Sequence, residues 1–413
     1  MLHSKSRDVI PIIPENEETG RPLKILLLEP YCGGSHRAWA EGYVACSRHD
    51  VTLLALPAHF WKWRMQGGAL TLAEQARALP CRPDLILASD MLNLPAFLGL
   101  ARDFLSGVPA VLYCHENQLT YLFPPGEKRD LTYGMINWLS MVAAERVFFN
   151  SRYHLEEWFE ALPRLLKHFP DYTHVHRIAE VRAKAEVLPV GCDLRRFDPR
   201  PSPPRSGGFG DSNSPGPRQS SPPRSGGFGD SNSPGSPLIL WNQRWEYDKD
   251  PQTFCRALLT LADEGLDFRV ALAGRNYRQQ APEFETVRER LGARVVHFGY
   301  ADATQYEALL RQADVVVSTA LHEFFGVAVV EAIYCGCFPV LPCRLVYPEL
   351  LPPSYHEACL YKDFEGLLAR LRWALAHPDQ TCALATELNP VVARFDWAVL
   401  GPRYDETLAA LAR

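Results

Sequence analysis

Short runs of apolar residues alternate with helix-length amphipathic segments along most of this chain, and this alternation limits the folds that it can adopt. The first series comprises KILLLEP (24–30), VTLLALP (51–57), DLILAS (84–89), AVLYCHEN (110–117) and RVFFNS (146–151). The second comprises LILWNQRW (238–245), FRVALAG (268–274), ARVVHFG (293–299), ADVVVST (313–319) and CFPVLP (337–342). Buried strands that alternate with helices form parallel sheets covered on both faces. The sequence therefore predicts an α/β protein with two Rossmann-like parallel-sheet domains that face a cleft.

A segment of different composition separates the two series. Proline, glycine and serine dominate it, and the unit SPPRSGGFGDSNSPG occurs at 202–216 and again at 221–235. Two copies without an apolar face cannot stack into a solenoid, so we predict a flexible linker or insertion. The expected parts are a disordered tail, a first Rossmann-like domain, the repeat linker, a second Rossmann-like domain and a helix that packs back on the first domain, at 1–20, 21–194, 195–237, 238–385 and 386–413.

Composition narrows the class of protein further. Of the 413 residues, 47% are hydrophobic, which is enough for two cores. The formal net charge of −5 gives no overall basic field, so a nucleic-acid partner would need a local patch. The polar first twenty residues and the lack of a long apolar stretch favour a cytoplasmic protein without membrane attachment. Neither zinc-type cysteine pairs nor a GxGxxG motif is present, so we expect no metal and no bound cofactor.

Two glutamates stand at the expected start of a helix in HEFFGVAVVEA (322–332). Glu323 and Glu331 would lie about 12 Å apart along the helix axis and could contact different parts of one extended ligand. Carboxylates accept hydrogen bonds from sugar hydroxyls, and the amides near Phe325 and Gly326 would suit a diphosphate. The alternative is one glutamate that stabilises the helix dipole and a second that is merely solvated.

Two cations, Arg244 and Lys249, follow the first apolar run of the second series in WNQRWEYDKDP. Fixed cations at the end of a strand could oppose a diphosphate and stabilise its charge as it leaves. A cluster of surface ion pairs with Glu246, Asp248 and Asp250 would explain the same residues. Asp248 and Asp250 also match an Asp-x-Asp metal-binding pattern, but the lysine between them favours direct contact with phosphate.

Polar side chains also follow two runs of the first series and would face the cleft. The glycines of YCGGSH permit the backbone to approach a phosphate or sugar closely, although a plain strand-to-helix turn would use the same residues. His115 follows another run, and a lone histidine is more often structural than catalytic. Here the predicted donor-binding residues are Gly33 and Gly34, and the predicted acceptor-binding residues are Ser35, His36, Asn117 and Gln118.

Taken together, these groups resemble the retaining glycosyltransferases of family 4, which have the GT-B fold. The resemblance rests on the order of the groups at the strand ends, on HEFFGVAVVEA and on the closing FDW segment, and it covers nearly the whole folded chain. It implies that His115 and Glu323 lie at the reacting sugar and that Glu331 binds the nucleotide ribose. It also implies that Arg244 and Lys249 bind the diphosphate, in a metal-independent hexosyltransferase reaction without a covalent nucleophile.

The N-terminal half narrows the resemblance. The segments LLLEPYCGGSHRAWAEG, PAHFWKWRMQGGA, YCHENQLTYLFP and FNSRYHLEEW are similar to the glycosyltransferase-like family that includes the tRNA-queuosine mannosyltransferase. This similarity implies GDP-mannose as the donor and queuosine in a tRNA as the acceptor. The repeat at 201–236 departs from the family, but it falls between the two domains.

The residues themselves say less about an RNA partner. In HFWKWR (59–64), Trp61 and Trp63 could stack on a splayed base while Lys62 and Arg64 meet phosphate. An amphipathic surface loop over packed tryptophans explains the segment equally well. Two other functions stay open at this point. One is a family 4 glycosyltransferase that acts on a lipid, saccharide or small metabolite, and the other is a non-catalytic protein that binds a nucleotide sugar or tRNA.

Overall fold

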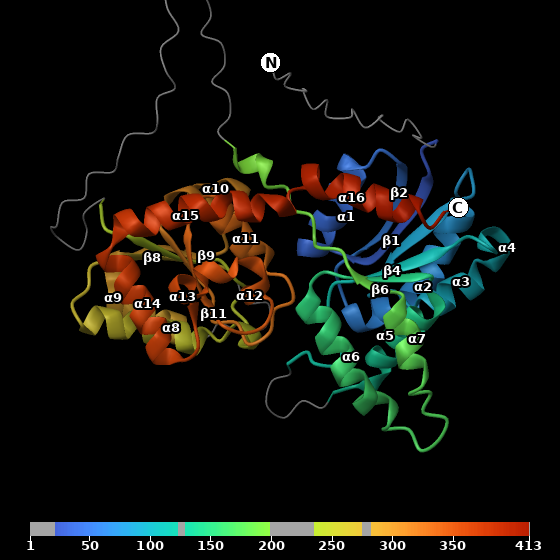
Figure 1. Ribbon diagram of the computed structural model, residues 1–413, viewed down its shortest axis with the longest axis horizontal. Helices are drawn as coiled ribbons and strands as arrows, with labels where there is room; N and C mark the ends of the chain where they lie inside the picture. The colour runs from blue at the N-terminus through green and yellow to red at the C-terminus, as the bar shows by residue number, and fades with distance from the viewer. Residues whose placement is uncertain (1–20, 123–128, 199–234, 275–281, 413) are drawn as a thin grey trace, which may run out of the picture.

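Two layered α/β domains lie side by side in the computed structural model, which describes residues 21–122, 129–198, 235–274 and 282–412 (Figure 1). The predicted pair of parallel-sheet domains is confirmed. Residues 1–20, for which we expect disorder, lie outside the described residues. So do both copies of the repeat, apart from the last residue of the second copy.

The first domain contains a six-stranded parallel sheet with the order β2-β1-β3-β4-β5-β6. Its strands are β1 (Lys24–Cys32), β2 (Asp50–Pro57), β3 (Leu85–Ser89), β4 (Ala110–Cys114), β5 (Arg146–Phe149) and β6 (Ala185–Val187). Its helices are α1 (Gly34–Cys46), α2 (Trp61–Arg77), α3 (Leu94–Leu100), α4 (Arg102–Leu105), α5 (Leu131–Ala143), α6 (Arg152–Leu166) and α7 (Arg177–Ala183). Every residue of β3 and β4 is buried, which is why these runs are continuously apolar.

The second domain repeats this plan with the strand order β12-β11-β10-β7-β8-β9. Its strands are β7 (Leu238–Trp241), β8 (Arg269–Ala273), β9 (Val295–Gly299), β10 (Val315–Val317), β11 (Phe338–Pro342) and β12 (Leu360–Tyr361). Its helices are α8 (Pro251–Asp263), α9 (Pro282–Leu291), α10 (Ala303–Gln312), α11 (Val327–Tyr334), α12 (Tyr347–Leu350), α13 (His356–Cys359), α14 (Phe364–Ala376) and α15 (Pro378–Val392). Each apolar run that the sequence analysis names contains a strand. The strands β6 and β12 were not predicted, because they are too short to give a recognisable apolar run.

The last helix, α16 (Trp397–Ala409), packs on the first domain although it follows the second in the chain (Figure 1). Gly42 and Gly191 leave room for its first side chain, because a Cβ atom at these positions would lie 2.0 and 2.4 Å from the Trp397 indole. Tyr43 of α1 donates a hydrogen bond to Asp405 Oδ1 at 2.9 Å. The chain therefore crosses twice between the domains, once before β7 and once after α15.

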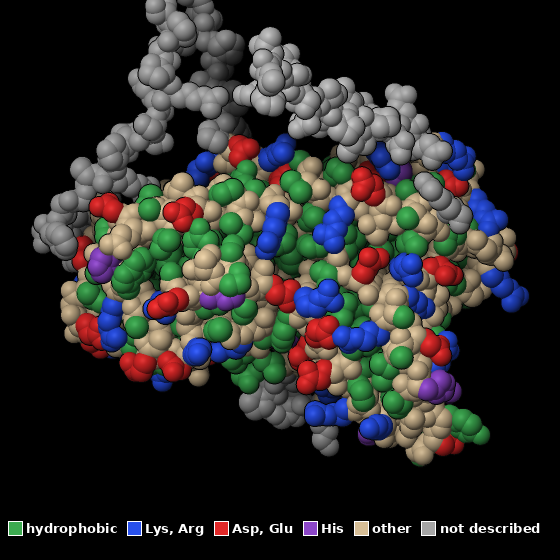
Figure 2. All heavy atoms as spheres, viewed as in Figure 1, with side chains coloured by type: hydrophobic (Ala, Val, Ile, Leu, Met, Phe, Trp, Pro, Cys, Tyr) green, Lys and Arg blue, Asp and Glu red, His purple; other side chains and the backbone are tan. Residues whose placement is uncertain are grey.

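Charged side chains of both signs cover the surface. On the face shown in Figure 2, Lys and Arg are intermixed with Asp and Glu over both domains, in keeping with the small net charge of −5. Among the helices of the described residues, none is both long enough and apolar enough to span a bilayer.

The carboxyl ends of the strands position the residues that the sequence singled out. Gly33 follows β1, His115 follows β4, and the loops after β7 and β10 contain Arg244 and Glu323. The strands β7 and β10 pair directly with each other. Because parallel strands end at one edge of a sheet, the loops after β7 and β10 meet.

Candidate active site

Four hydrogen bonds fix the carboxylate of Glu323 in the loop between β10 and α11. Its Oε1 accepts from the backbone N–H groups of Phe324, Phe325 and Gly326 at 3.1, 3.4 and 3.1 Å. Its Oε2 accepts from Lys249 Nζ at 3.2 Å. Burial opposes ionisation, but the lysine and the backbone donor hold the pKa of Glu323 below its usual value. Glu323 is therefore charged at neutral pH and holds the loop that leads into α11, as the alternative interpretation expected of a glutamate at the helix start. The solvated position that this alternative gave to Glu331 is wrong, because only 12% of the Glu331 side chain is exposed.

Lys249 joins the loop after β7 to the loop after β10. Its Nζ donates to the His322 carbonyl oxygen at 2.7 Å and lies 3.1 Å from Asp248 Oδ2 and 3.2 Å from Glu323 Oε2. An ammonium group has three N–H donors, and three oxygen atoms surround this one. Burial opposes its charge, but Glu323 and Asp248 raise the pKa of Lys249. The lysine is a fixed cation at neutral pH.

Arg244 lies on the outer side of this cluster. Its guanidinium is 3.4 Å from Glu246 Oε2 and 3.6 Å from Asp248 Oδ2. Burial opposes its charge, but Asp248 and Glu246 raise the pKa of Arg244 above the usual range. The predicted surface ion pairs with these two carboxylates are thus present. Since 45% of the Arg244 side chain is exposed, the same guanidinium remains accessible to an anionic ligand.

The two carboxylates of the Asp-x-Asp pattern have different partners. Asp248 is buried beside Lys249. Asp250 caps α8, where its Oδ1 accepts from the Thr253 N–H at 3.2 Å, and its φ of 48° turns the chain into that helix. The capping hydrogen bond engages Asp250, so the two carboxylates do not converge on one position that could hold a metal ion.

Glu331 lies about one turn into α11, in a separate polar network. Its Oε1 accepts from Arg196 Nη2 at 2.7 Å, and its Oε2 accepts from the Tyr306 hydroxyl at 2.7 Å. Asn242, which follows β7, donates from Nδ2 to the same hydroxyl at 3.1 Å. Burial raises the pKa of Glu331, while Arg196 and Tyr306 oppose that shift. Asn242 Oδ1 is buried without a hydrogen-bond donor in the described part of the chain.

In the first domain, His115 stacks against a second histidine. The ring centroids of His115 and His36 are 4.2 Å apart, and His36 Nδ1 lies 3.0 Å from Glu29 Oε2. Burial opposes a charge on His36, but Glu29 raises the pKa of this imidazole to about 9. Burial and the charge of His36 hold the pKa of His115 well below its usual value. At neutral pH a charged His36 therefore supports a neutral His115, whose Nε2 is buried without a partner among the described residues.

Within the described part of the chain, these three side chains also form a group that could hold a metal ion. Glu29, His36 and His115 offer ligand atoms that all lie within 4.8 Å of one another. Two histidines and one carboxylate are common ligands of transition metals. A protonated His36 has no free lone pair, however, so the ion pair with Glu29 competes with metal binding.

The turn that precedes His36 requires both of its glycines. A Cβ atom on Gly33 would lie 2.4 Å from the Cβ of Ala58, so this turn packs directly on the loop after β2. Gly34 has a φ of +53°, a conformation that favours glycine. Ser35 is exposed beside it.

The other two predicted acceptor residues are buried below His115. Asn117 Oδ1 accepts from the Leu119 N–H at 2.9 Å, which leaves Asn117 Nδ2 buried without an acceptor in the described ranges. The Gln118 side chain is buried, and the backbone carbonyl oxygen of this residue accepts from Arg129 Nη1 at 2.7 Å. An unpaired buried amide is costly and is a place where a ligand can supply the missing acceptor.

The two halves of the site meet across the domain junction. Tyr121 of the first domain and His322 of the second have ring centroids 4.8 Å apart. His154, near the start of α6, stacks on Phe324 with centroids 4.2 Å apart and an interplanar angle of 22°. His154 also lies 3.1 Å from the backbone oxygen of Glu116, the residue after His115, while His322 and Phe324 are the neighbours of Glu323 in the chain. The segments that carry the two predicted catalytic residues therefore meet at this junction, and their catalytic roles stay a prediction.

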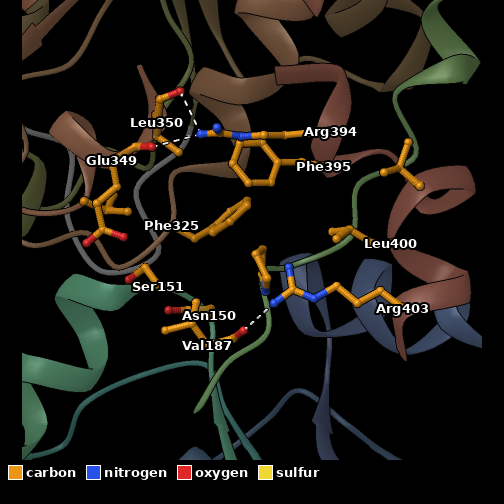
Figure 3. A pocket seen from close by; sticks show the side chains of 13 residues that line it. Asn150, Ser151, Val187, Phe325, Glu349, Leu350, Arg394, Phe395, Leu400 and Arg403 are labelled. Carbon is orange, nitrogen blue, oxygen red and sulfur yellow. Dashed lines mark hydrogen bonds between the residues drawn. The ribbon is translucent and has the colours of Figure 1, made fainter. Parts of the chain in front are cut away.

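A pocket of about 390 Å³ lies at the same junction and is lined by both domains and by α16 (Figure 3). Phe325 and Phe395 contribute rings with centroids 5.1 Å apart, and Arg394 donates to the carbonyl oxygens of Glu349 and Leu350. The Phe325 ring thus lines this pocket, while the backbone N–H group of Phe325 donates to the Glu323 carboxylate. The donor-binding role of Phe325 stays a prediction.

The sequence did not predict three residues that bind the predicted site residues through hydrogen bonds or ion pairs, namely Glu29, Arg196 and Tyr306. Glu29 gave a signal, because a carboxylate inside the buried run KILLLEP requires a partner. Tyr306 and Arg196 gave none, because each is an ordinary polar residue that only long-range folding brings to Glu331.

The solved structures show the fold, and a family model shows the class of protein. The HepE structure from Anabaena with UDP-glucose matches with a TM-score of 0.64 and 18% identity, over 94% of this chain and 100% of that one. The sucrose-phosphate synthase of Thermosynechococcus elongatus matches with a TM-score of 0.67 and 16% identity, over 94% and 99% of the two chains. These proteins share the GT-B fold. Residues 229–379 match the family of group 1 glycosyl transferases, so the chain is a glycosyltransferase of family 4.

The first domain identifies the family. Residues 24–192 match the tRNA-queuosine alpha-mannosyltransferase N-terminal family. The chain is 33% identical to the tRNA-queuosine alpha-mannosyltransferase of Drosophila melanogaster over 349 residues, 84% of this chain and 85% of that protein. It therefore belongs to the tRNA-queuosine alpha-mannosyltransferase family, as the resemblance implied. A GDP-mannose:cellobiosyl-diphosphopolyprenol alpha-mannosyltransferase of Xanthomonas campestris is 28% identical over 187 residues, 42% of this chain and 47% of that protein.

Proposed function

We propose that this protein transfers mannose from GDP-mannose to queuosine in a tRNA, with retention of configuration and without a metal ion. Family membership supports the reaction as a whole, and the name of the Xanthomonas relative supports GDP-mannose as the donor. One observation in this chain carries the proposal. Glu323, Lys249 and Arg244 belong to one connected charged cluster at the carboxyl ends of β7 and β10, and His322 beside this cluster contacts Tyr121 of the first domain.

On the donor side, the two cations would neutralise the diphosphate. Arg244 is accessible, and Lys249 lies behind it as a fixed charge. As the sugar bond breaks, negative charge grows on the diphosphate, and preorganised cations stabilise that charge most strongly where water is excluded. These residues would supply the charge that a metal ion supplies in other glycosyltransferases, which supports a metal-independent reaction.

The glutamates would hold the two ends of the donor. Glu323 remains charged and 24% of its side chain is exposed, so it can accept hydrogen bonds from sugar hydroxyls. Glu331 would accept from the ribose hydroxyls, with Tyr306 holding its carboxylate in place. The four hydrogen bonds on Glu323 make it a poor covalent nucleophile, which supports retention by attack on the same face of the sugar.

The acceptor would enter from the first domain. His115 has a buried and unpaired Nε2, and Asn117 has an unpaired Nδ2. A neutral imidazole can donate or accept a hydrogen bond, so His115 can contact a hydroxyl of the transferred sugar or of the acceptor. We include Ser35 and the charged His36 on the acceptor side, because they border the same turn.

The proposal is tested by incubation of the protein with GDP-mannose and tRNA, followed by digestion to nucleosides and mass analysis. Queuosine should gain one hexose, and the same tRNA without queuosine should gain none. Hexose on a lipid or saccharide but not on queuosine would replace this proposal with another family 4 activity. Binding of GDP-mannose without transfer to any acceptor would indicate a non-catalytic protein.

A further inference from the structure

We propose that Phe60 and Trp63 form a stacking platform for unpaired bases of the acceptor RNA. The proposal rests on the proposed function and adds to it the surface that holds the RNA. Both residues lie where β2 ends and α2 begins, at the carboxyl edge of the first sheet.

Both rings are exposed to an unusual degree. Phe60 is 81% exposed and Trp63 is 62% exposed. Trp61, between them, instead packs on Tyr133 with ring centroids 4.8 Å apart. The interpretation of HFWKWR as a loop over packed tryptophans therefore holds for Trp61 and fails for Trp63. Two exposed aromatic rings one helical turn apart lose free energy in water unless a partner covers them.

Gly67 has no side chain, so one face of the Trp63 ring can lie against the α2 backbone. A Cβ atom on Gly67 would lie 2.7 Å from Cζ2 and 2.8 Å from Cε2 of the indole. The indole therefore lies against the backbone of α2 one turn ahead, with its other face towards solvent. A rigid aromatic face of this kind costs little conformational entropy when a base stacks on it.

The backbone of Phe60 is strained, although its ring gains nothing from burial. Its φ is +53°, and this conformation is rare for a bulky residue. The Trp63 and Arg64 N–H groups hold it by donating to the Phe60 carbonyl oxygen at 2.8 and 3.1 Å. Strained backbone clusters at ligand-binding sites, and at Phe60 it accompanies a second exposed ring one turn away.

Two positively charged side chains beside the rings favour an RNA partner. Lys62 is exposed, and its Nζ lies 5.6 Å from the centre of the Trp61 ring. Arg64 donates from Nε to the Pro57 carbonyl oxygen at 3.1 Å. Proteins that bind single strands combine cations for the phosphates with aromatic rings for the bases. A protein-binding surface is instead depleted of lysine at its core.

The platform is continuous with the acceptor side of the site. Ala58, two residues before Phe60, packs against Gly33 of the turn that carries His36. Tyr31 packs in one cluster with Trp61 and has its ring centroid 6.0 Å from that of His36. An RNA strand stacked on the platform would therefore lie beside the turn that we place on the acceptor side of the site.

Trp63→Ala tests the platform in two assays on the full chain. The first gives KM and kcat for queuosine-containing tRNA, and the second gives the affinity for a fluorescein-labelled single-stranded RNA without donor. Both the KM for tRNA and the Kd for RNA should rise about 5- to 150-fold, the usual effect of removing one base–aromatic stack. The kcat and the KM for GDP-mannose should stay unchanged. Phe60→Ala should behave in the same way.

Matched variants separate stacking from misfolding. Trp63→Phe keeps an aromatic face and should retain most of the affinity, whereas Gly67→Ala should weaken RNA binding by displacing the indole. Tyr172→Ala is the control, because this residue is 82% exposed in the loop between α6 and α7, at the opposite edge of the sheet. It should bind RNA like the wild type.

The outcomes distinguish the platform from the reaction. If the wild type mannosylates queuosine and Trp63→Ala binds RNA equally well, the platform is wrong and the proposed function stands. If the wild type transfers no hexose but Trp63→Ala lowers RNA affinity, the reaction is wrong and the platform stands. A wild type that binds no RNA overturns the platform.

Discussion

Glu323→Gln separates the catalytic role of this residue from its role at the start of α11. The amide oxygen of glutamine can keep the three backbone N–H donors that Oε1 now accepts. The amide nitrogen would then face Lys249 Nζ, which lies 3.2 Å from Oε2, so one ionic hydrogen bond becomes a contact between two donors. A hydrogen bond to a charged group contributes about 1.5–3 kcal/mol. The variant should fold with its stability lowered by about 2 kcal/mol.

The activity should fall much further than the stability. If the carboxylate stabilises the transferring sugar, its loss should lower kcat about 10²- to 10³-fold, as removal of one preorganised electrostatic contact does. The KM for the donor should change little, because the contact strengthens mainly in the transition state. Initial rates of hexose transfer to tRNA and urea unfolding of the same preparations measure the two effects.

Asp363→Asn is the matched control. Asp363 caps α14, where its Oδ1 accepts from the Gly366 N–H at 2.8 Å, in a helix outside the proposed site. Asparagine keeps an oxygen that can accept this hydrogen bond, so the variant should lose less than about 1 kcal/mol of stability and leave kcat unchanged. A folded Glu323→Gln enzyme with wild-type kcat would refute the reasoning and leave Glu323 only as a stabiliser of α11.

Four further predictions follow from the same contacts. Burial opposes but Glu29 raises the pKa of His36 to about 9, so this pair should add about 3 kcal/mol below pH 6.5 that is lost as pH rises through about 9. Urea unfolding of the wild type should show this loss, and His36→Gln should not. Tyr306→Phe removes a 2.7 Å donor to Glu331 and should raise the donor KM about tenfold with a smaller change in kcat. Equal KM values would argue against a ribose contact. Transfer should persist with a metal chelator, whereas a loss that Mg²⁺ or Mn²⁺ restores would show a metal requirement. Gly191→Ala would place a Cβ atom 2.4 Å from the indole of α16 and should cost about 1–3 kcal/mol in thermal unfolding; an unchanged melting temperature would contradict that packing.

The fold could be predicted from the sequence because its central strands are buried on both faces. DLILAS and VVVST contain such strands, and continuous apolar runs between amphipathic segments are typical of a parallel sheet covered by helices. The strands β6 and β12 were missed because three and two residues carry no periodicity. Their pairing is decided by neighbouring strands rather than by local propensity.

The site was legible only where one segment carries several of its residues. HEFFGVAVVEA carries Glu323 and Glu331 in one short segment, Glu323 in the loop before α11 and Glu331 within the helix, so the sequence alone keeps them near each other. The partners of these glutamates come from distant segments: Arg196 precedes the repeat, and Tyr306 lies on α10. The sequence also could not distinguish Trp61 from Trp63, because the direction of each ring depends on Tyr133 and Gly67.

One measurement tests the central claim most directly: the nucleosides of queuosine-containing tRNA after reaction with GDP-mannose, compared for the wild type and Glu323→Gln. We expect a single added hexose on queuosine with the wild type, removable by an α-specific mannosidase, and almost none with the variant. A hexose in β linkage would contradict retention of configuration. No hexose on queuosine, with the same preparation transferring mannose to another acceptor, would contradict the account of the acceptor.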